Sequence, residues 1–279
     1  MSAPWCVVTV ARLHLDTLAV SGQFSQITSG FVGYSTLRRH APCETGCVTL
    51  SPTPVIAAFD LDGTLSDGGS VFKWLRFLCG TRATYSSALR LAGPILVGAL
   101  RSGPWADEAK ERLLLRLLAG RPDEDVHDAS RVFALAHFEE HGRPRVTQRL
   151  EWHLRQGHDV VIVSASPQIY VEVLAEHLNA AAGIGTRLAV DPLGKLTGGY
   201  LGKNCRGREK LRRLNEWIES THPGVPPVIF AYGNSRGDRR MLRAATYPYD
   251  VGKLGPLGAL RHFPRLKSKE TQTGIIADE

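Results

Sequence analysis

The chain has 279 residues, of which 43% are hydrophobic and 22% are charged, and its formal net charge is +7. This length and composition are those of a folded protein with a sizeable core, and they exclude a largely disordered chain. The basic surplus suits anionic small molecules, an anionic membrane face or nucleic acid, and an ordinary solvated basic surface is an equal alternative. Zinc-finger spacing and aromatic RNA-binding motifs are absent, so we expect no nucleic-acid partner.

The cysteines and the apolar runs indicate in which cellular compartment the protein is expected. The five cysteines are scattered, and Cys43 and Cys47 have no second pair of ligands to complete a zinc site. A reduced, cytoplasmic protein is the simpler account. No run reaches the roughly 18 apolar residues that a membrane span requires, and the longest candidate, residues 91–100, contains Pro94.

Residues 1–54 differ from the rest of the chain. They show no sustained helical or strand period, and they lack the basic start and unbroken apolar core of a secretory signal. We expect a poorly ordered extension, for which an over-long gene model with a true start near Val48 is one explanation.

From residue 55 onward, apolar strand-like runs alternate with amphipathic helical segments. Continuous apolar runs predict strands that are covered on both faces, as in a parallel sheet. We expect strands at Val55–Phe59, Val160–Val163, Arg187–Val190 and Val228–Tyr232, and helices at 169–181 and 208–219. This alternation is typical of an α/β fold with a doubly wound parallel sheet.

Roughly 100 residues separate the first two strands, far more than one crossover helix requires. The interval has an all-helical pattern, with helices beginning at Asp107 and near Asp123, and a third over about 145–156 that returns to the sheet. We predict an inserted all-helical cap domain at 68–148. The core would comprise 55–67 and 149–265, followed by a flexible tail at 266–279.

Polar stretches follow the predicted strands at the edge where doubly wound sheets bind ligands. The first, "DLDGT", places Asp60 and Asp62 at a strand tip, with Gly63 allowing a tight turn. Two carboxylates so close repel each other unless a cation or a shared proton compensates. The second, "SASPQ", offers the Ser164 hydroxyl and backbone N–H groups near a helix start, which together suit a phosphate group.

The third stretch, "GNSRGD", brings Asn234 and Asp238 to the end of the strand at 228–232. Upstream of it, "KNCRGREKLRRL" offers Lys203 and Lys210 as candidate cations. The order and strand-end positions of these stretches resemble those of the haloacid dehalogenase-like (HAD) superfamily over about residues 55–252.

This resemblance implies a Mg²⁺-dependent phosphomonoester phosphatase that acts through an aspartyl-phosphate intermediate. Asp60 would be the nucleophile, and Asp62 would protonate the leaving alkoxide and then activate water. The implied phosphate-binding residues are Thr64, Ser164, Ala165 and Lys210, and the implied metal ligands are Asp60, Asp62, Asn234 and Asp238. Lys210 is preferred to Lys203 because it lies 24 residues before Asn234, near the usual family spacing, and opens a helix.

One position departs from the family pattern, because Asn234 stands where relatives usually carry Asp. Its amide oxygen can still coordinate Mg²⁺, but without charge, so we expect a lower metal affinity. The alternatives left open are a phosphomutase and a catalytically weakened binding or regulatory protein.

Within the superfamily, the chain is similar to the phosphoserine-phosphatase-like branch (HAD-IB type), and to bacterial phosphatidylglycerophosphate phosphatase-like members. The implied substrate is a small phosphomonoester or a lipid phosphate. The apolar run at 91–100, beside basic patches at 206–213 and 261–269, would suit peripheral contact with the inner face of an anionic membrane. An equal alternative is that the run at 91–100 is the core of the cap. No motif names the leaving group or the oligomeric state.

Overall fold

The computed structural model describes residues 53–91, 104–253 and 258–267. The extension expected at 1–54 lies almost wholly outside the described residues, as do most of the apolar run at 91–100 and the tail beyond 267. Within the described ranges, no helix is long and apolar enough to cross a membrane.

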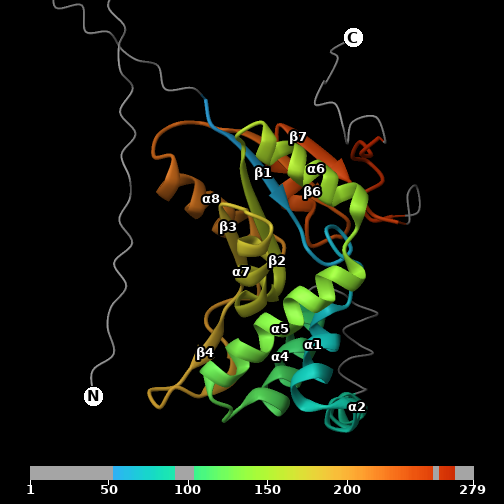
Figure 1. The fold of residues 1–279 in the computed structure, drawn as a ribbon, viewed down its shortest axis with the longest axis vertical. Coiled ribbons are helices and arrows are strands. Elements are labelled where there is room, and N and C mark those ends of the chain that lie inside the picture. Colours follow the sequence, from blue (N-terminus) through green and yellow to red (C-terminus); the bar gives the residue numbers. More distant parts are fainter. Residues whose placement is uncertain (1–52, 92–103, 254–257, 268–279) are drawn as a thin grey trace, which may run out of the picture. The chain divides into compact units, whose positions relative to one another are not determined.

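The predicted doubly wound parallel sheet is confirmed. Five strands lie in the order β3-β2-β1-β6-β7, and every neighbouring pair is parallel. Figure 1 shows the blue strand β1 beside β6 and β2. The strands are β1 (Val55–Phe59), β2 (Asp159–Pro167), β3 (Ala182–Thr186), β6 (Val228–Gly233) and β7 (Tyr247–Asp250).

The central strand β1 is buried on both faces, which explains its unbroken apolar sequence. Ala57 and Phe59 belong to one hydrophobic cluster, and Ile56 and Ala58 belong to another on the opposite face. The first cluster includes residues of α6 (Pro144–Arg155) and α7 (Gln168–His177). The second includes residues of α8 (Arg208–Thr221) and α9 (Arg239–Ala244).

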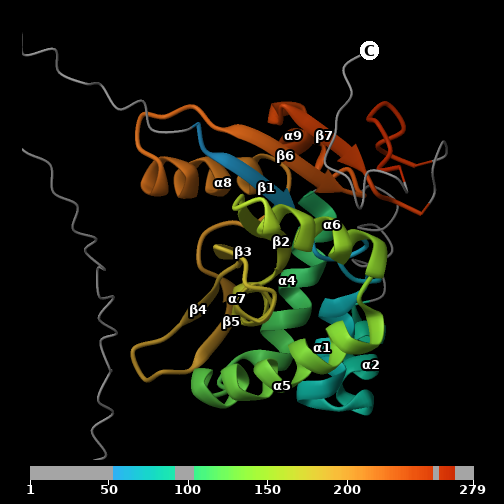
Figure 2. The same ribbon diagram turned by 45° about the horizontal axis from the view of Figure 1, so that its top comes forward.

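The described segment between β1 and β2 contains helices and the turns that connect them, but no strand, as its pattern predicts. Figure 2 shows most of its helices gathered below the sheet, while α4 runs from them toward it. Its described helices before α6 are α1 (Ser70–Cys79), α2 (Thr81–Arg90), α4 (Pro104–Leu118) and α5 (Asp123–His141). The predicted helix start at Asp107 falls in the first turn of α4, and the predicted start near Asp123 matches α5.

The predicted end of the cap at residue 148 falls inside α6. Val146 and Leu150 of this helix are buried in the same cluster as Ala57 and Phe59 of the sheet, so α6 packs with the core. We therefore propose that the helical cap ends at the turn 142–143, before α6 begins.

The expectation of a parallel-sheet strand at Arg187–Val190 is wrong. Residues Leu188–Val190 form β4, which pairs antiparallel with β5 (Leu196–Tyr200) in a separate two-stranded sheet. The edge position beside β2 is taken by β3 instead. A Cβ at Gly183 of β3 would lie 2.7 Å from the Val171 carbonyl oxygen of α7, so the close packing of α7 on β3 requires glycine here. Because β3 therefore lacks a continuous run of large apolar residues, its sequence does not predict a strand.

Strand β7 was also not expected from the sequence. Its four residues include Pro248, which lacks an N–H donor and is tolerated because β7 lies at the edge of the sheet.

Candidate active site

The loop after β1 carries the two aspartates of the first polar stretch. The Asp60 N–H donates to the Tyr232 carbonyl at 3.0 Å, which continues the pairing of β1 with β6. The chain then turns sharply, with the N–H groups of Thr64 and Ser66 donating to the Leu61 carbonyl at 3.1 and 3.0 Å. Since parallel strands end at one edge of the sheet, this turn holds Asp60 beside the last residues of β2 and the loop that follows β6.

Asp60 is 5% exposed, and its carboxylate is held by two donors. Lys210 Nζ donates to one oxygen at 2.7 Å, and the Thr64 hydroxyl donates to the other at 3.1 Å. Burial, and then repulsion from Asp238, raises the pKa of Asp60 to about 7, although Lys210 acts in the opposite direction. The carboxylate is therefore fixed in place. Its negative charge, together with that of Asp238, is not fully balanced by Lys210.

Lys210, in the first turn of α8, connects two carboxylates. Its ammonium also donates to Asp238 Oδ1 at 2.5 Å. Burial acts to lower the pKa of Lys210, but Asp238 and Asp60 together outweigh it and raise this pKa above its usual range. The lysine is thus a permanent cation at the centre of the site.

Asp238, predicted as a metal ligand, already has protein donors on both oxygens. While Oδ1 receives Lys210, Oδ2 accepts from the Asn234 N–H at 3.2 Å, from the Ser235 N–H at 2.9 Å and from the Ser235 hydroxyl at 2.8 Å. Burial opposes its ionisation, but Lys210 and then Ser235 hold the pKa of Asp238 below its usual value. This arrangement counts against direct metal contact, and ligation by Asp238 stays a prediction.

Asp62 faces the start of α1 and the end of β2. Its carboxylate accepts from the Ser70 N–H at 2.9 Å, the Ser70 hydroxyl at 2.7 Å and the Ser166 hydroxyl at 2.6 Å. The Ser70 hydroxyl also lies 2.7 Å from the Tyr170 hydroxyl. Burial, and then the charge of Asp62, raises the pKa of Tyr170 well above its usual value, so this phenol stays protonated. The donors fix the orientation of Asp62 where the cap meets the core.

The predicted phosphate-binding stretch lies beside Asp62. Ser164 is 1% exposed, and its hydroxyl accepts from the Ser166 N–H at 3.1 Å. The Ala165 carbonyl accepts from the Thr186 hydroxyl at 2.7 Å and from Lys110 Nζ of α4 at 2.8 Å. The stretch is therefore tied both to the sheet and to the cap.

Asn234 packs directly against the turn after β1. Gly63 has a φ of +82°, and a Cβ there would lie 2.0 Å from Asn234 Nδ2, so only glycine fits. The Thr64 hydroxyl oxygen lies 3.4 Å from Asn234 Oδ1 and 3.1 Å from Asp60 Oδ2. An amide oxygen and a carboxylate oxygen thus converge on one hydroxyl group.

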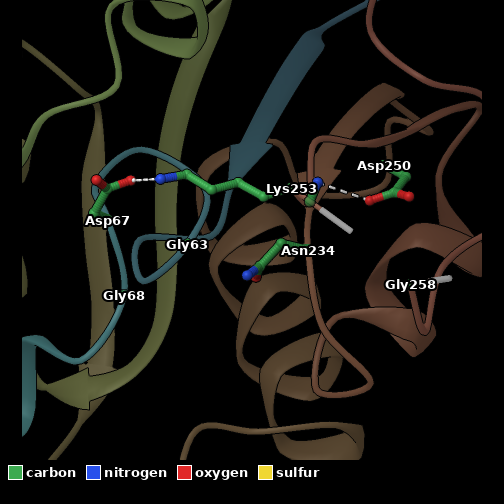
Figure 3. Close-up of a pocket in the computed structure, with 8 residues that line it drawn as sticks. Gly63, Asp67, Gly68, Asn234, Asp250, Lys253 and Gly258 are labelled. Atoms are coloured by element: carbon green, nitrogen blue, oxygen red, sulfur yellow. Dashed lines mark hydrogen bonds and ion pairs between the residues drawn. The ribbon is translucent and has the colours of Figure 1, made fainter. Parts of the chain in front are cut away.

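A pocket of about 320 Å³ opens beside Asn234, and Figure 3 shows the Asn234 amide within it. Lys253 extends past the amide to Asp67, with its Nζ 2.8 Å from Asp67 Oδ1. The pocket is lined by Gly63, Asp67, Gly68, Asn234, Asp250, Gly252, Lys253 and Gly258. Asn234 is therefore accessible from this side.

The donors around Asn234 suit a hard cation. Mg²⁺ prefers oxygen ligands, which the Asp60 carboxylate and the Asn234 amide supply. No group of three His, Cys, Asp or Glu residues that could hold a metal occurs in the described part of the chain. The implied Mg²⁺ site thus fits in donor type, but it offers little negative charge.

The structure brings predicted residues of the three polar stretches together. Of the two candidate lysines, Lys210 contacts Asp60, whereas Lys203 is exposed.

The site also contains residues that the sequence did not single out. The residues missed are Ser70, Ser166 and Tyr170 around Asp62, Lys110 on Ala165, and Arg143, which donates to the carbonyls of Gly63, Thr64 and Val251. Only the Ser-x-Ser pattern around Ser164 offered a signal for any of them.

Comparison with known sequences gives a consistent set of similarities. A family model described as haloacid dehalogenase-like hydrolase matches residues 57–243. Protein CicA of Caulobacter vibrioides is 32% identical over 192 residues, which cover 69% of this chain and 83% of CicA. A histidinol-phosphatase of Neisseria meningitidis serogroup C is 22% identical over 198 residues, which cover 70% of this chain and 89% of that protein.

Solved structures show the same fold. A protein of unknown function from Bordetella pertussis Tohama I has a TM-score of 0.64 at 22% identity, over 77% of this chain and 99% of that chain. A phospho-aspartyl intermediate analogue of phosphoserine phosphatase has a TM-score of 0.51 at 18% identity, over 71% of this chain and 86% of that chain.

Proposed function

Because the chain belongs to the haloacid dehalogenase-like hydrolase family, we propose that it is a Mg²⁺-dependent phosphomonoester phosphatase. Family membership makes the chain a hydrolase, which confirms the expectation of an enzyme. The observation that carries the proposal is the buried Asp60 carboxylate, held by Lys210 at 2.7 Å and by Thr64 at 3.1 Å at the tip of β1. The similar histidinol-phosphatase and the fold shared with phosphoserine phosphatase favour the same reaction class.

In the proposed reaction, an oxygen of Asp60 attacks phosphorus, and the bond between phosphorus and the ester oxygen breaks. This step forms an aspartyl-phosphate and releases an alkoxide, to which Asp62 gives a proton. Asp62 then takes a proton from water as the water oxygen attacks phosphorus, which releases phosphate and restores Asp60. Lys210, and the stretch beginning at Ser164, would hold the phosphoryl oxygens during both steps.

The hydrogen bonds of Asp62 support its proposed role. Three donors from Ser70 and Ser166 aim this carboxylate at the junction of cap and core, where the cap would place the leaving group. The nearer acceptor of the Thr64 hydroxyl is the Asp60 carboxylate, so any support that Thr64 gives to the phosphate would act through Asp60.

Asp60, the Asp62 carbonyl and Asn234 are the proposed ligands of Mg²⁺. When bound, Mg²⁺ neutralises negative charge on the phosphoryl group and on Asp60. Because Asp238 is engaged by Lys210 and Ser235, we propose that it acts by orienting Lys210 and the loop that carries Asn234.

The finer assignments are proposals that rest on the sequence. They are placement in the phosphoserine-phosphatase-like branch, a small or lipid phosphomonoester as substrate, and a cytoplasmic location with contact at an anionic membrane face.

Hydrolysis of an aryl phosphate, with Mg²⁺ and with a chelator, tests the proposal. We expect turnover only with Mg²⁺, and loss of turnover in Asp60→Asn. Beryllium fluoride, which mimics an acyl phosphate, should inhibit only when Mg²⁺ is present. If the folded wild-type protein binds phosphate esters without hydrolysing any, the weakened binding protein is the better description.

A further inference from the structure

Arg143 lies between α5 and α6, in the turn where the proposed cap ends. Backbone hydrogen bonds attach this turn to the loop after β1. The Arg143 N–H donates to the Leu65 carbonyl at 2.8 Å, and the Asp67 N–H donates to the His141 carbonyl at 2.8 Å. The side chain of Arg143 therefore starts directly beside the loop that carries the proposed nucleophile.

The Arg143 guanidinium connects two loops through their backbone carbonyls. Nη1 donates to the Gly63 carbonyl and, at 3.3 Å, to the Thr64 carbonyl, both in the loop after β1. Nη2 donates at 2.9 Å to the carbonyl of Val251, which follows β7. Because the guanidinium is planar and the directions of its N–H bonds are fixed, these hydrogen bonds hold the two loops at a defined separation.

Asn234, a proposed Mg²⁺ ligand, lies between these two loops. On one side, a Cβ at Gly63 would lie 2.0 Å from Asn234 Nδ2. On the other side, the Val251 N–H donates at 2.9 Å to the carbonyl of Gly233, the residue before Asn234. Figure 3 shows the Asn234 amide between the Gly63 turn and the segment that carries Lys253. The two loops that the guanidinium joins are therefore the loops that contain Asn234 between them.

The loop after β1 also fixes the direction of the Asp62 carbonyl, another proposed Mg²⁺ ligand. The Gly63 N–H donates to the Ser66 carbonyl at 2.7 Å. In a trans peptide the carbonyl points opposite to the N–H, so the Asp62 carbonyl points away from Ser66. Arg143 holds the next peptide through the Gly63 carbonyl. The Asp62 carbonyl and the Asn234 amide thus lie on backbone that Arg143 joins.

The acceptors of the guanidinium indicate a geometric role. Every acceptor that the described residues provide is a backbone carbonyl, and none is a carboxylate. Burial lowers the pKa of Arg143, and the charge of Asp67 opposes this shift only in part. The Asp67 carboxylate is paired instead with Lys253, at 2.8 Å. Arg143 therefore contributes directed donors to the loops, and it remains a cation because arginine stays protonated in proteins.

We infer that Arg143 is a positioning residue of the metal site, which holds the Asp62 carbonyl and the Asn234 amide in the mutual arrangement that Mg²⁺ needs. This inference rests on the proposed Mg²⁺-dependent function. Mg²⁺ demands near-ideal octahedral geometry, so a small displacement of its ligands lowers its affinity. The positive charge of Arg143 alone would repel Mg²⁺, so its charge and its positioning of the ligands act on metal affinity in opposite directions.

Titration calorimetry of Mg²⁺ binding without substrate tests the inference. Arg143→Gln removes both the charge and the planar guanidinium, and we expect its Kd for Mg²⁺ to rise about tenfold, the effect of losing one hydrogen bond from a charged donor. Loss of the charge would lower the Kd, so a rise reports positioning alone. Arg143→Lys keeps the charge, but its single ammonium cannot hold both loops, and it should also bind Mg²⁺ more weakly than the wild type.

Aryl-phosphate turnover provides a second measurement. In both variants kcat should approach the wild-type value at saturating Mg²⁺, because no residue proposed to contact the substrate has changed. The matched control is Arg145→Gln, at an exposed arginine in the first turn of α6 whose charge also acts on Arg143. Its Kd for Mg²⁺ should not rise. Thermal unfolding without Mg²⁺ shows which variants are folded, and if Arg143→Gln does not fold, Arg143→Lys carries the same test.

A Kd for Mg²⁺ that is unchanged or lower in either folded variant would overturn the inference. Turnover that stays low at saturating Mg²⁺ would also overturn it, since Arg143 would then serve the fold or the chemical step instead of the metal site. Failure of the proposed function is distinguishable, because the wild type itself would then bind no Mg²⁺ in the calorimeter and hydrolyse no aryl phosphate.

Discussion

Replacing Asp60 by Asn should stabilise the folded protein above neutral pH while it abolishes turnover. The buried site holds two carboxylates, Asp60 and Asp238, against the single cation Lys210. Burial and the charge of Asp238 raise the pKa of Asp60 from 3.8 to about 7. In the unfolded chain this carboxyl titrates near its ordinary value.

The sign of the pH dependence follows from these two values. Between roughly pH 4 and pH 7 the folded protein retains a proton that the unfolded chain has lost, so stability falls as the pH rises through this window. Above pH 7, ionised Asp60 lowers the free energy of unfolding by at most about 4 kcal/mol. This is the free energy that corresponds to the rise in the pKa of Asp60. Asn cannot ionise, and its carbonyl oxygen can still accept from Lys210.

Thermal unfolding at roughly pH 5 and pH 8 in a chelator measures this difference. Asp60→Asn should raise Tm by several degrees at the higher pH and by much less at the lower one, and Mg²⁺ should raise Tm of the wild type more than that of the variant. Asp128→Asn, at an exposed position of α5, is the control and should show neither effect. A gain that does not depend on pH, or a loss of stability at pH 8, would refute the charge imbalance.

Three further changes test other parts of the site, and a fourth tests the extension. Asn234→Asp should lower the Mg²⁺ concentration for half-maximal aryl-phosphate turnover by about tenfold, because a carboxylate adds Coulomb attraction on the order of 1 to 4 kcal/mol; an unmoved midpoint would place the metal elsewhere. Gly63→Ala should destabilise the fold by about 1–3 kcal/mol in urea titrations, since its Cβ would lie 2.0 Å from the Asn234 amide at a positive φ. Ser166→Ala removes a 2.6 Å hydrogen bond to Asp62, so kcat should fall about tenfold for alkyl phosphates and less for aryl phosphates, whose leaving groups need little protonation; equal losses would contradict the acid role. A chain that starts at Val48 should melt cooperatively and hydrolyse substrate like the full chain, and loss of folding would show that the extension was misread.

The sequence predicted the parts of the site that directly follow buried strands. Asp60, Ser164 and Asn234 each lie close behind a continuous apolar run, and parallel strands bring their carboxyl ends together without further information. The same reasoning could not find Ser70, because its contact with Asp62 depends on how the cap folds back over the sheet. Lys110 was missed for the same reason, since nothing in a helical pattern tells which lysine faces the core.

The errors in the fold have a related cause. β3 escaped notice because the close approach of α7 demands glycine where a strand usually carries large apolar residues. The apolar residues at 188–190 had the right composition, but they pair locally with β5 instead of joining the sheet. Hydrophobicity alone predicts burial, whereas the partner of a strand depends on which backbones can approach each other.

The central position of β1 has a consequence for the synthesis of the chain. This strand emerges from the ribosome before all other strands of the sheet, yet its two partners, β2 and β6, begin only at residues 159 and 228. Until both have been made, an apolar β-branched segment has neither neighbour to pair with, and such unpaired strands promote association between nascent chains. Pairing across long sequence separations also slows folding. We therefore expect the helical cap to form first, and the yield of folded protein to depend on chaperones that shield the segment at 55–59 while translation continues.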